Sequence, residues 1–201
     1  MDEPETEKFR PTNSRVFGIL AVLTALVIPV LWVVDRSAHI PGWLVWASLL
    51  FGVLAFGSML LPAISLTPER LVLRNMLETV SIPLAAVEQV AVRQVTAVLA
   101  GEKRYVNPAI GKSWRAALRS GRAPESDPTA LAPANPHDIS YADFVQQRIY
   151  QRASQERDRL GIPNSSDEQL EAARGIERAP FWPMIVAVAI CVVGLIAAII
   201  V

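Results

Sequence analysis

The sequence has few cysteines and histidines and no excess of charge of either sign. Lysine plus arginine and aspartate plus glutamate each number 19 among 201 residues. A general nucleic-acid-binding protein usually has a clear basic excess, so we expect no nucleic-acid partner. The single cysteine, Cys191, excludes a disulfide within the chain and a cysteine-based metal site. The two histidines, His39 and His137, lie far apart in the sequence, and we therefore expect neither a metal nor another cofactor.

The stretch YVNPAIGKS, residues 105–113, resembles a phosphate-binding loop but lacks the first glycine of that motif. The motif is G-x-x-x-x-G-K-[ST], and Val106 stands where its first glycine belongs. The loop wraps phosphate with backbone N–H groups, in torsions and at distances that a β-branched residue resists. Pro108 also removes one N–H donor from the stretch. The pattern therefore argues against a nucleotide-binding site.

Charge is absent from three long apolar runs, residues 16–34, 43–61 and 181–201. Each has about the 20 residues that an α-helix needs to cross a hydrocarbon core about 30 Å thick. Three such runs leave too little polar surface to cover them in a soluble core. We therefore predict a multi-pass membrane protein with transmembrane helices at these positions and a short loop at 35–42. Because the runs contain no Asp, Glu, Lys, Arg or His, a transporter or pump is disfavoured.

The distribution of lysine and arginine predicts the orientation of these helices. Basic residues gather on the side of the chain that would carry the tail 1–15 and the middle segment, whereas the loop 35–42 holds Arg36 alone. They are Lys8, Arg10 and Arg15 before the first run, Arg70 and Arg74 after the second, and Arg174 and Arg178 before the third. By the positive-inside rule, the tail and the middle segment face the cytoplasm at the plasma membrane.

Between the second and third runs, the apolar residues alternate. Residues 63–106 contain about five short alternating segments separated by turn residues, which indicates an antiparallel meander rather than β-α-β units. Residues 119–138, rich in Pro, Ala and Asp, predict a flexible linker. Residues 139–161 predict an amphipathic helix, and the juxtamembrane segment 162–180 contains a possible short helix. The apolar stripe of the longer helix comprises Tyr141, Phe144, Val145, Ile149, Ala153 and Leu160. Packing on the sheet is the first interpretation of this stripe, and a partner-binding coiled coil is the second.

An antiparallel meander closed by one amphipathic helix is the layout of pleckstrin-homology (PH) folds. Here the segment also carries the pattern R-N-x-L … I-P-x-x-x-V, at Arg74, Asn75, Leu77, Ile82, Pro83 and Val87. With the preceding helical hairpin, the chain from about 9 to 106 resembles the bacterial PH-like domains of small actinobacterial membrane proteins. The resemblance implies an α+β membrane protein with an N-terminal two-helix hairpin, a PH-like β-barrel or sheet over 62–118, a closing helix and a C-terminal transmembrane helix. A complete PH barrel has seven strands, and the resemblance brings no catalytic residue.

Basic residues and one tryptophan gather around the stretch 105–113. They are Lys103, Arg104, Lys112, Trp114, Arg115, Arg119 and Arg122. One interpretation is a patch held against anionic lipid headgroups, at about 1 kcal/mol per cation near the surface. The other is a solvated strand end and helix face, with Trp114 covering the end of the β domain.

Our leading hypothesis from the sequence is a membrane-anchored adaptor or scaffold without catalytic activity. It would bind a protein partner or an anionic lipid surface. An accessory subunit of a larger membrane complex is the alternative. An enzyme, either a hydrolase or a nucleotide-binding protein, is a third possibility, but His137, Asp138 and Ser140 are adjacent only in sequence.

Overall fold

The computed structural model describes residues 6–9, 13–35, 39–111 and 141–200. Within these ranges the protein is α+β, with antiparallel sheets and three long apolar helices. The chain divides into two compact units. Unit 1 comprises Met1–Arg10, Ala63–Leu73 and Val80–Glu177, and unit 2 comprises Pro11–Pro62, Arg74–Thr79 and Arg178–Val201.

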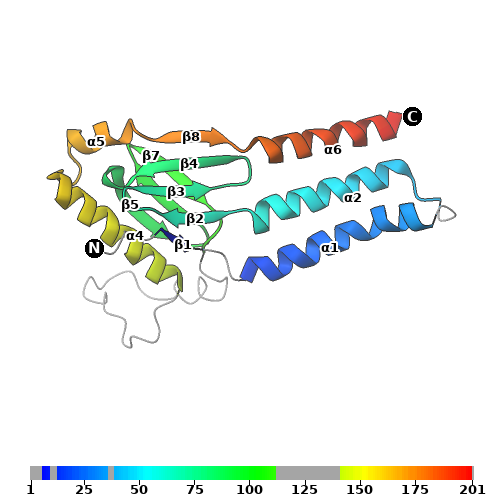
Figure 1. Cartoon of the computed structure of the whole chain (residues 1–201), viewed down its shortest axis with the longest axis horizontal. Helices are drawn as coiled ribbons and strands as arrows, with labels where there is room; N and C mark the ends of the chain where they lie inside the picture. The colour runs from blue at the N-terminus through cyan, green and yellow to red at the C-terminus, as the bar shows by residue number, and fades with distance from the viewer. Residues whose placement is uncertain (1–5, 10–12, 36–38, 112–140, 201) are drawn as a thin grey trace, which may run out of the picture. The chain divides into compact units, whose positions relative to one another are not determined.

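The long helices belong to unit 2. They are α1 (Asn13–Val34), α2 (Gly42–Ala55), which the π-helical turn Phe56–Leu60 extends, and α6 (Trp182–Ile200). They lie side by side, and α2 contacts both α1 and α6 (Figure 1). All three are apolar and long enough to cross a membrane, by length and composition. The three predicted runs are therefore confirmed as helices of membrane-spanning length.

A proline in the interior of α1 explains one contact between α1 and α2. Pro29 has no N–H, so the carbonyl four residues earlier, that of Ala25, loses its partner within the helix. Ser48 of α2 donates its hydroxyl to this same carbonyl. Gly52, one turn further along α2, lies against Ala25, where an added Cβ would come within 3.0 Å of the Ala25 Cβ. Lipid hydrocarbon has no hydrogen-bond donor for this carbonyl. The Ser48 hydroxyl supplies the donor and at the same time links α2 to α1.

Replacing this serine should weaken the packing of α1 on α2. We expect Ser48→Ala to cost about 1 kcal/mol, the size of a hydrogen bond between membrane helices. Ser58→Ala is the matched control, because Ser58 bonds to Leu54 in its own helix. In a Pro29→Ala background the N–H of residue 29 can bond to the Ala25 carbonyl, so the cost of Ser48→Ala should nearly vanish. Unfolding of the full chain in mixed micelles measures these differences, and equal costs in both backgrounds would contradict the assignment.

The strands form two sheets. The first has the order β1-β2-β3-β4-β8, and the second has the order β5-β6-β7. Their bounds are β1 Glu7–Phe9, β2 Ala63–Leu66, β3 Arg70–Arg74, β4 Glu78–Pro83, β5 Val87–Val92, β6 Thr96–Ala100, β7 Lys103–Asn107 and β8 Glu177–Pro180. In the part of the chain that the structure describes, these strands do not close into a barrel. The expected antiparallel pairing is therefore confirmed, and of the two expected arrangements, a barrel or a sheet, the described residues show sheets.

Two of the strands lie outside the segment in which strands were expected. β1 falls in the predicted tail 1–15, and it pairs antiparallel with β2 so that Phe9 lies opposite Ile64. β8 falls in the juxtamembrane segment 162–180. Their residues, EKF and ERAP, show no alternation of apolar and polar side chains, so neither strand is predictable from its own letters.

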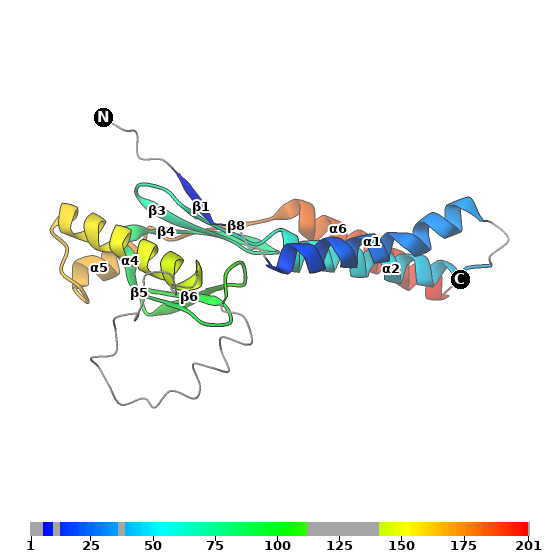
Figure 2. The same cartoon turned by 90° about the horizontal axis from the view of Figure 1, so that it is seen from below.

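The core of unit 1 is formed by the inward side chains of the strands and by one helix. Alternate residues of β3 and β4, such as Leu71 and Ile82, are fully buried. The helix α4 (Tyr141–Leu160) packs on β5 and on the short 3-10 turn Leu84–Ala86 (Figure 2). The amphipathic helix predicted at 139–161 is therefore confirmed within a residue or two at each end.

The predicted apolar stripe of α4 is only partly correct. Val145, Ile149 and Ala153 are fully buried against the sheet, as expected for a helix that packs on its own domain. Tyr141, Phe144 and Leu160, however, are about half exposed, at 47%, 51% and 51%. The buried residues, Ala142, Val145, Ile149, Ala153 and Arg157, follow one another in steps of three or four along almost the whole helix, so only one narrow face is covered. Tyr141 and Phe144 lie beside that face, and Leu160 is the last residue of the helix, beyond the last buried position.

A backbone irregularity in β5 anchors both helices that follow the sheets. The register of β5 against β6 shifts between Val87 and Gln89, as in a β-bulge. The Val87 carbonyl accepts hydrogen bonds from Arg157 of α4, at 2.6 Å, and from Gln169 of α5 (Asp167–Ala173), at 3.2 Å. Gln169 is 1% exposed and also donates to the Ala85 carbonyl. The buried polar groups of α4 and α5 are thus satisfied by this one stretch of backbone.

Candidate functional site

The predicted basic patch is described only in part. Lys103 and Arg104 are exposed on β7, which is an edge strand of its sheet. The remaining members, Lys112, Trp114, Arg115, Arg119 and Arg122, lie outside the described residues. Charged side chains on an edge strand also discourage pairing with another chain, so these two positions have a structural use of their own. The role of the patch in lipid binding stays a prediction.

The stretch that resembles a phosphate-binding loop uses its backbone inside unit 1. Its strand, β7, pairs antiparallel with β6, whereas the motif requires a β-α-β setting. The Ala109 N–H donates to Asn107 Oδ1 at 2.9 Å, and the Thr96 hydroxyl donates to the Ile110 carbonyl at 2.9 Å. Ala109 and Ile110 are buried. These groups hold the end of β7 against β6 and are not arranged as a cradle for an anion.

The residues named for a hydrolase cannot be placed, since His137, Asp138 and Ser140 lie outside the described residues. Over the ranges that the structure covers, no group of three His, Cys, Asp or Glu residues is arranged to hold a metal ion. Two features of the described residues remain as candidates for a site, an ion-pair cluster and a pocket.

An ion-pair cluster joins the first strand to α4. Glu7 of β1 accepts hydrogen bonds from Arg148, at 2.6 to 3.1 Å, and from Arg152, at 3.0 Å. The hydrogen bonds from Arg148 hold the pKa of the Glu7 carboxyl below its ordinary value, with a smaller contribution from Arg152. The cluster ties the predicted tail to the helix, so its role is structural.

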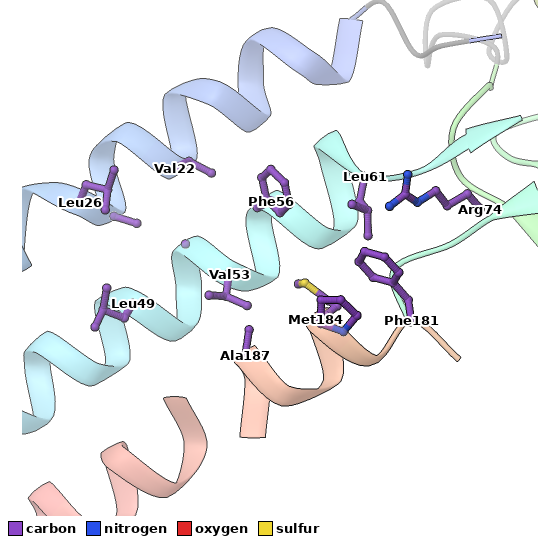
Figure 3. A pocket seen from close by; sticks show the side chains of 13 residues that line it. Val22, Leu26, Leu49, Val53, Phe56, Leu61, Arg74, Phe181, Met184 and Ala187 are labelled. Atoms are coloured by element: carbon purple, nitrogen blue, oxygen red, sulfur yellow. The ribbon is translucent and has the colours of Figure 1, made fainter. Parts of the chain in front are cut away.

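The candidate binding site is a pocket of about 530 Å³ in unit 2, which we call the interhelical pocket (Figure 3). Such a volume lies within the range of small-molecule sites, about 300 to 1,000 Å³. The pocket is bordered by one face of each long helix and by residues near the helix ends. They are Val22, Ala25 and Leu26 of α1, Leu49, Gly52, Val53 and Phe56 of α2 and its extension, Pro183, Met184 and Ala187 of α6, and Leu61, Arg74 and Phe181.

The local sequence explains why this pocket is apolar along its length. The α2 contributors, Leu49, Gly52, Val53 and Phe56, are spaced i, i+3, i+4 and i+7, so they share one helical face. Gly52 has no side chain, which lets α1 approach α2 closely at Ala25. Leucine, valine and phenylalanine supply hydrocarbon walls and no hydrogen-bonding group.

One end of the pocket differs from the rest because it carries a positive charge. Arg74, at the end of β3, is the single charged residue among the lining residues that the structure describes. Its guanidinium lies over the ring of Phe181, 4.7 Å from the ring centroid (Figure 3). The Phe181 N–H donates to the Leu77 carbonyl at 2.7 Å, which fixes the backbone that carries the ring. The ring therefore helps to position the guanidinium at this end of the pocket.

Sequence reasoning did not identify this site. In the sequence, Arg74 is a basic residue that follows an apolar run and a member of the R-N-x-L pattern, and Phe181 is the first residue of the third apolar run. The available signal was weak: an arginine shortly after one run and an aromatic residue at the edge of another. Nothing in the sequence indicated that the two side chains would stack.

Comparisons with protein-family models, with curated proteins and with solved structures found no match to this chain.

Proposed function

We propose that the protein is a membrane-anchored binding module without catalytic activity, whose PH-like unit lies on the cytoplasmic face of the plasma membrane. The observation that carries the proposal is the order of elements. Four strands, β1 to β4, are followed by a second sheet of three, β5 to β7, and then by α4, which packs on β5. The first seven of the eight strands in the described residues, followed by one packed helix, resemble the layout expected of PH folds. Adaptors that recruit a protein or a lipid surface are the functions that such a unit suits.

The distribution of charge supports the cytoplasmic assignment. Arg15 stands at the start of α1, Arg70 and Arg74 follow α2 in the chain, and Arg174 and Arg178 precede α6. Lysine and arginine near the ends of membrane helices favour the cytoplasmic side. The N-terminal strand and both sheets therefore belong to that side in this proposal, and the α1–α2 loop belongs to the other.

Cysteine labelling in intact cells tests this orientation. In a Cys191→Ala background, we expect Asp35→Cys, at the end of α1, to react with a membrane-impermeant maleimide from outside. Arg104→Cys, on an exposed position of β7, should react only after the membrane is permeabilised. The reverse pattern would contradict the proposal, because the charge rule would then have assigned the wrong side.

Purification of the full chain in mild detergent tests the adaptor role against the alternative. An adaptor binds its partners reversibly. The chain extracted in detergent should therefore carry few partners, and not in a fixed ratio. Partners that co-purify in a constant ratio through two chromatographic steps would instead identify an accessory subunit of a stable complex.

A further inference from the structure

We infer that the interhelical pocket binds one anionic phospholipid, with an acyl chain along the helices and the phosphate at Arg74. This site is distinct from the adaptor surface of unit 1. It depends on one part of the proposed function, namely that α1, α2 and α6 lie in a bilayer, and not on the orientation of the chain or on the PH-like fold.

The body of the pocket suits a hydrocarbon chain. Its walls come from the apolar faces of three helices, and the α2 side runs from Leu49 to Leu61. Twelve residues of helix correspond to about 18 Å, which is close to the depth of one leaflet of a hydrocarbon core about 30 Å thick. An acyl chain that entered beside Leu61 would thus reach Leu49 near the middle of the bilayer.

The charged end of the pocket suits an anionic headgroup. Arg74 lies beside Leu61 and Phe181, at the end of the pocket where α2 finishes and α6 begins (Figure 3). A helix end is where the headgroups of a leaflet meet water, so the guanidinium lies at headgroup depth. Guanidinium groups bind phosphate with paired N–H donors, more specifically than an ammonium does. One cation at one end of an apolar channel is the complement of a molecule with one anionic end and a long apolar tail.

A lipid suits this lining better than a helix from a partner protein. A phospholipid carries one anionic end and a long apolar tail, which matches one cation at the end of an apolar lining. A partner helix would have to bring an acidic side chain to the position of Arg74, in addition to an apolar face.

Native mass spectrometry of the full chain in detergent tests the inference. The probes are phosphatidylglycerol and phosphatidylcholine with identical acyl chains, which differ only in the headgroup. We expect the one-to-one complex with phosphatidylglycerol to form at about tenfold lower lipid concentration, because a charge-assisted contact to an anionic headgroup is retained. Glycerol 3-phosphate at millimolar concentration should not displace the lipid, because it offers the anion without the chain.

Five variants, three for the charge and two for the channel, test these two features separately. Arg74→Gln should abolish the headgroup preference, whereas Arg74→Lys should retain much of it. Arg178→Gln is the matched control, because Arg178 lies in the same unit and outside the pocket lining. Ala187→Phe should fill the channel and reduce binding of both lipids by at least about tenfold. Ala197→Phe, at an exposed position of the same helix, should not change it.

Several results would overturn the inference. These are an unchanged headgroup preference in Arg74→Gln, lipid binding by Ala187→Phe equal to that by Ala197→Phe, and displacement by glycerol 3-phosphate. A lipid-free dimer as the main species would assign the pocket to a second copy of the chain. Because the measurement is made in detergent, it does not depend on which side of the membrane unit 1 faces. A labelling result against the proposed orientation would therefore leave the lipid site unaffected. Likewise, an absence of lipid binding would leave the proposed orientation unaffected.

Discussion

Val98→Asp is expected to unfold unit 1. Val98 lies in β6 and is fully buried in the core of unit 1. An aspartate there would leave a carboxylate in apolar surroundings, and a buried charge without a partner costs about 3 to 5 kcal/mol. Domains of this kind are stable by only about 5 to 15 kcal/mol, so the substitution removes a large share of the total. Pulse proteolysis of the full chain in mild detergent, across a urea series, measures the loss.

The matched control is Val106→Asp in the neighbouring strand. Val106 lies in β7 opposite Ala97, and it is 44% exposed. Its side chain points away from the core, because successive residues of a strand alternate between faces. The same substitution at this position should change stability by less than about 0.5 kcal/mol. Equal losses for the two valines would mean that the register of β6 and β7 is wrong.

Phe9→Ala should destabilise unit 1 almost as much, although Phe9 belongs to a segment that the sequence predicts as a tail. Phe9 is 6% exposed and packs in the core of unit 1, opposite Ile64 of β2. Replacing a buried phenylalanine with alanine costs about 3 to 5 kcal/mol, through lost burial and the cavity left behind. We expect the proteolysis midpoint of unit 1 to shift to clearly lower urea.

Phe17→Ala provides the control for this second prediction. Phe17 lies in α1 and is 65% exposed, so the loss of its ring removes no core contact in unit 1. Its effect on the proteolysis midpoint should be close to zero. If Phe9→Ala were as mild as Phe17→Ala, β1 would not be an integral strand, and the Glu7 ion pairs with α4 would not stabilise it.

The membrane helices were predictable because the relevant signal is local and continuous. About twenty apolar residues in a row are required by the thickness of a bilayer, whatever the rest of the chain does. The helix α4 was predictable for a related reason, since a period near 3.6 over twenty residues is a strong pattern. How wide a face of the helix would be buried was not predictable, because burial of Tyr141 or Phe144 depends on how much of the helix surface the rest of unit 1 covers.

The strands show the opposite case. β3 and β4 alternate visibly, with Leu71 and Ile82 on the buried face. β1 and β8 have three and four residues, and nothing in their own letters distinguishes them from loops. Their pairing with strands far along the chain makes them strands. Whether a sheet closes into a barrel is likewise a property of many strands together, so the sequence left a barrel and a sheet open, and among the described residues the strands form two sheets without closure.

The sequence by itself determined that three helices would be apolar along their whole length and that the segment between the second and third would form antiparallel sheets and a helix. Both properties follow from periodicity within short windows. Only the tertiary structure decided that Phe9 completes a core, that Ser48 satisfies the carbonyl freed by Pro29, and that Arg74 meets Phe181. Each of these contacts joins residues distant in the chain, and the position of one partner is set by packing that no local pattern encodes.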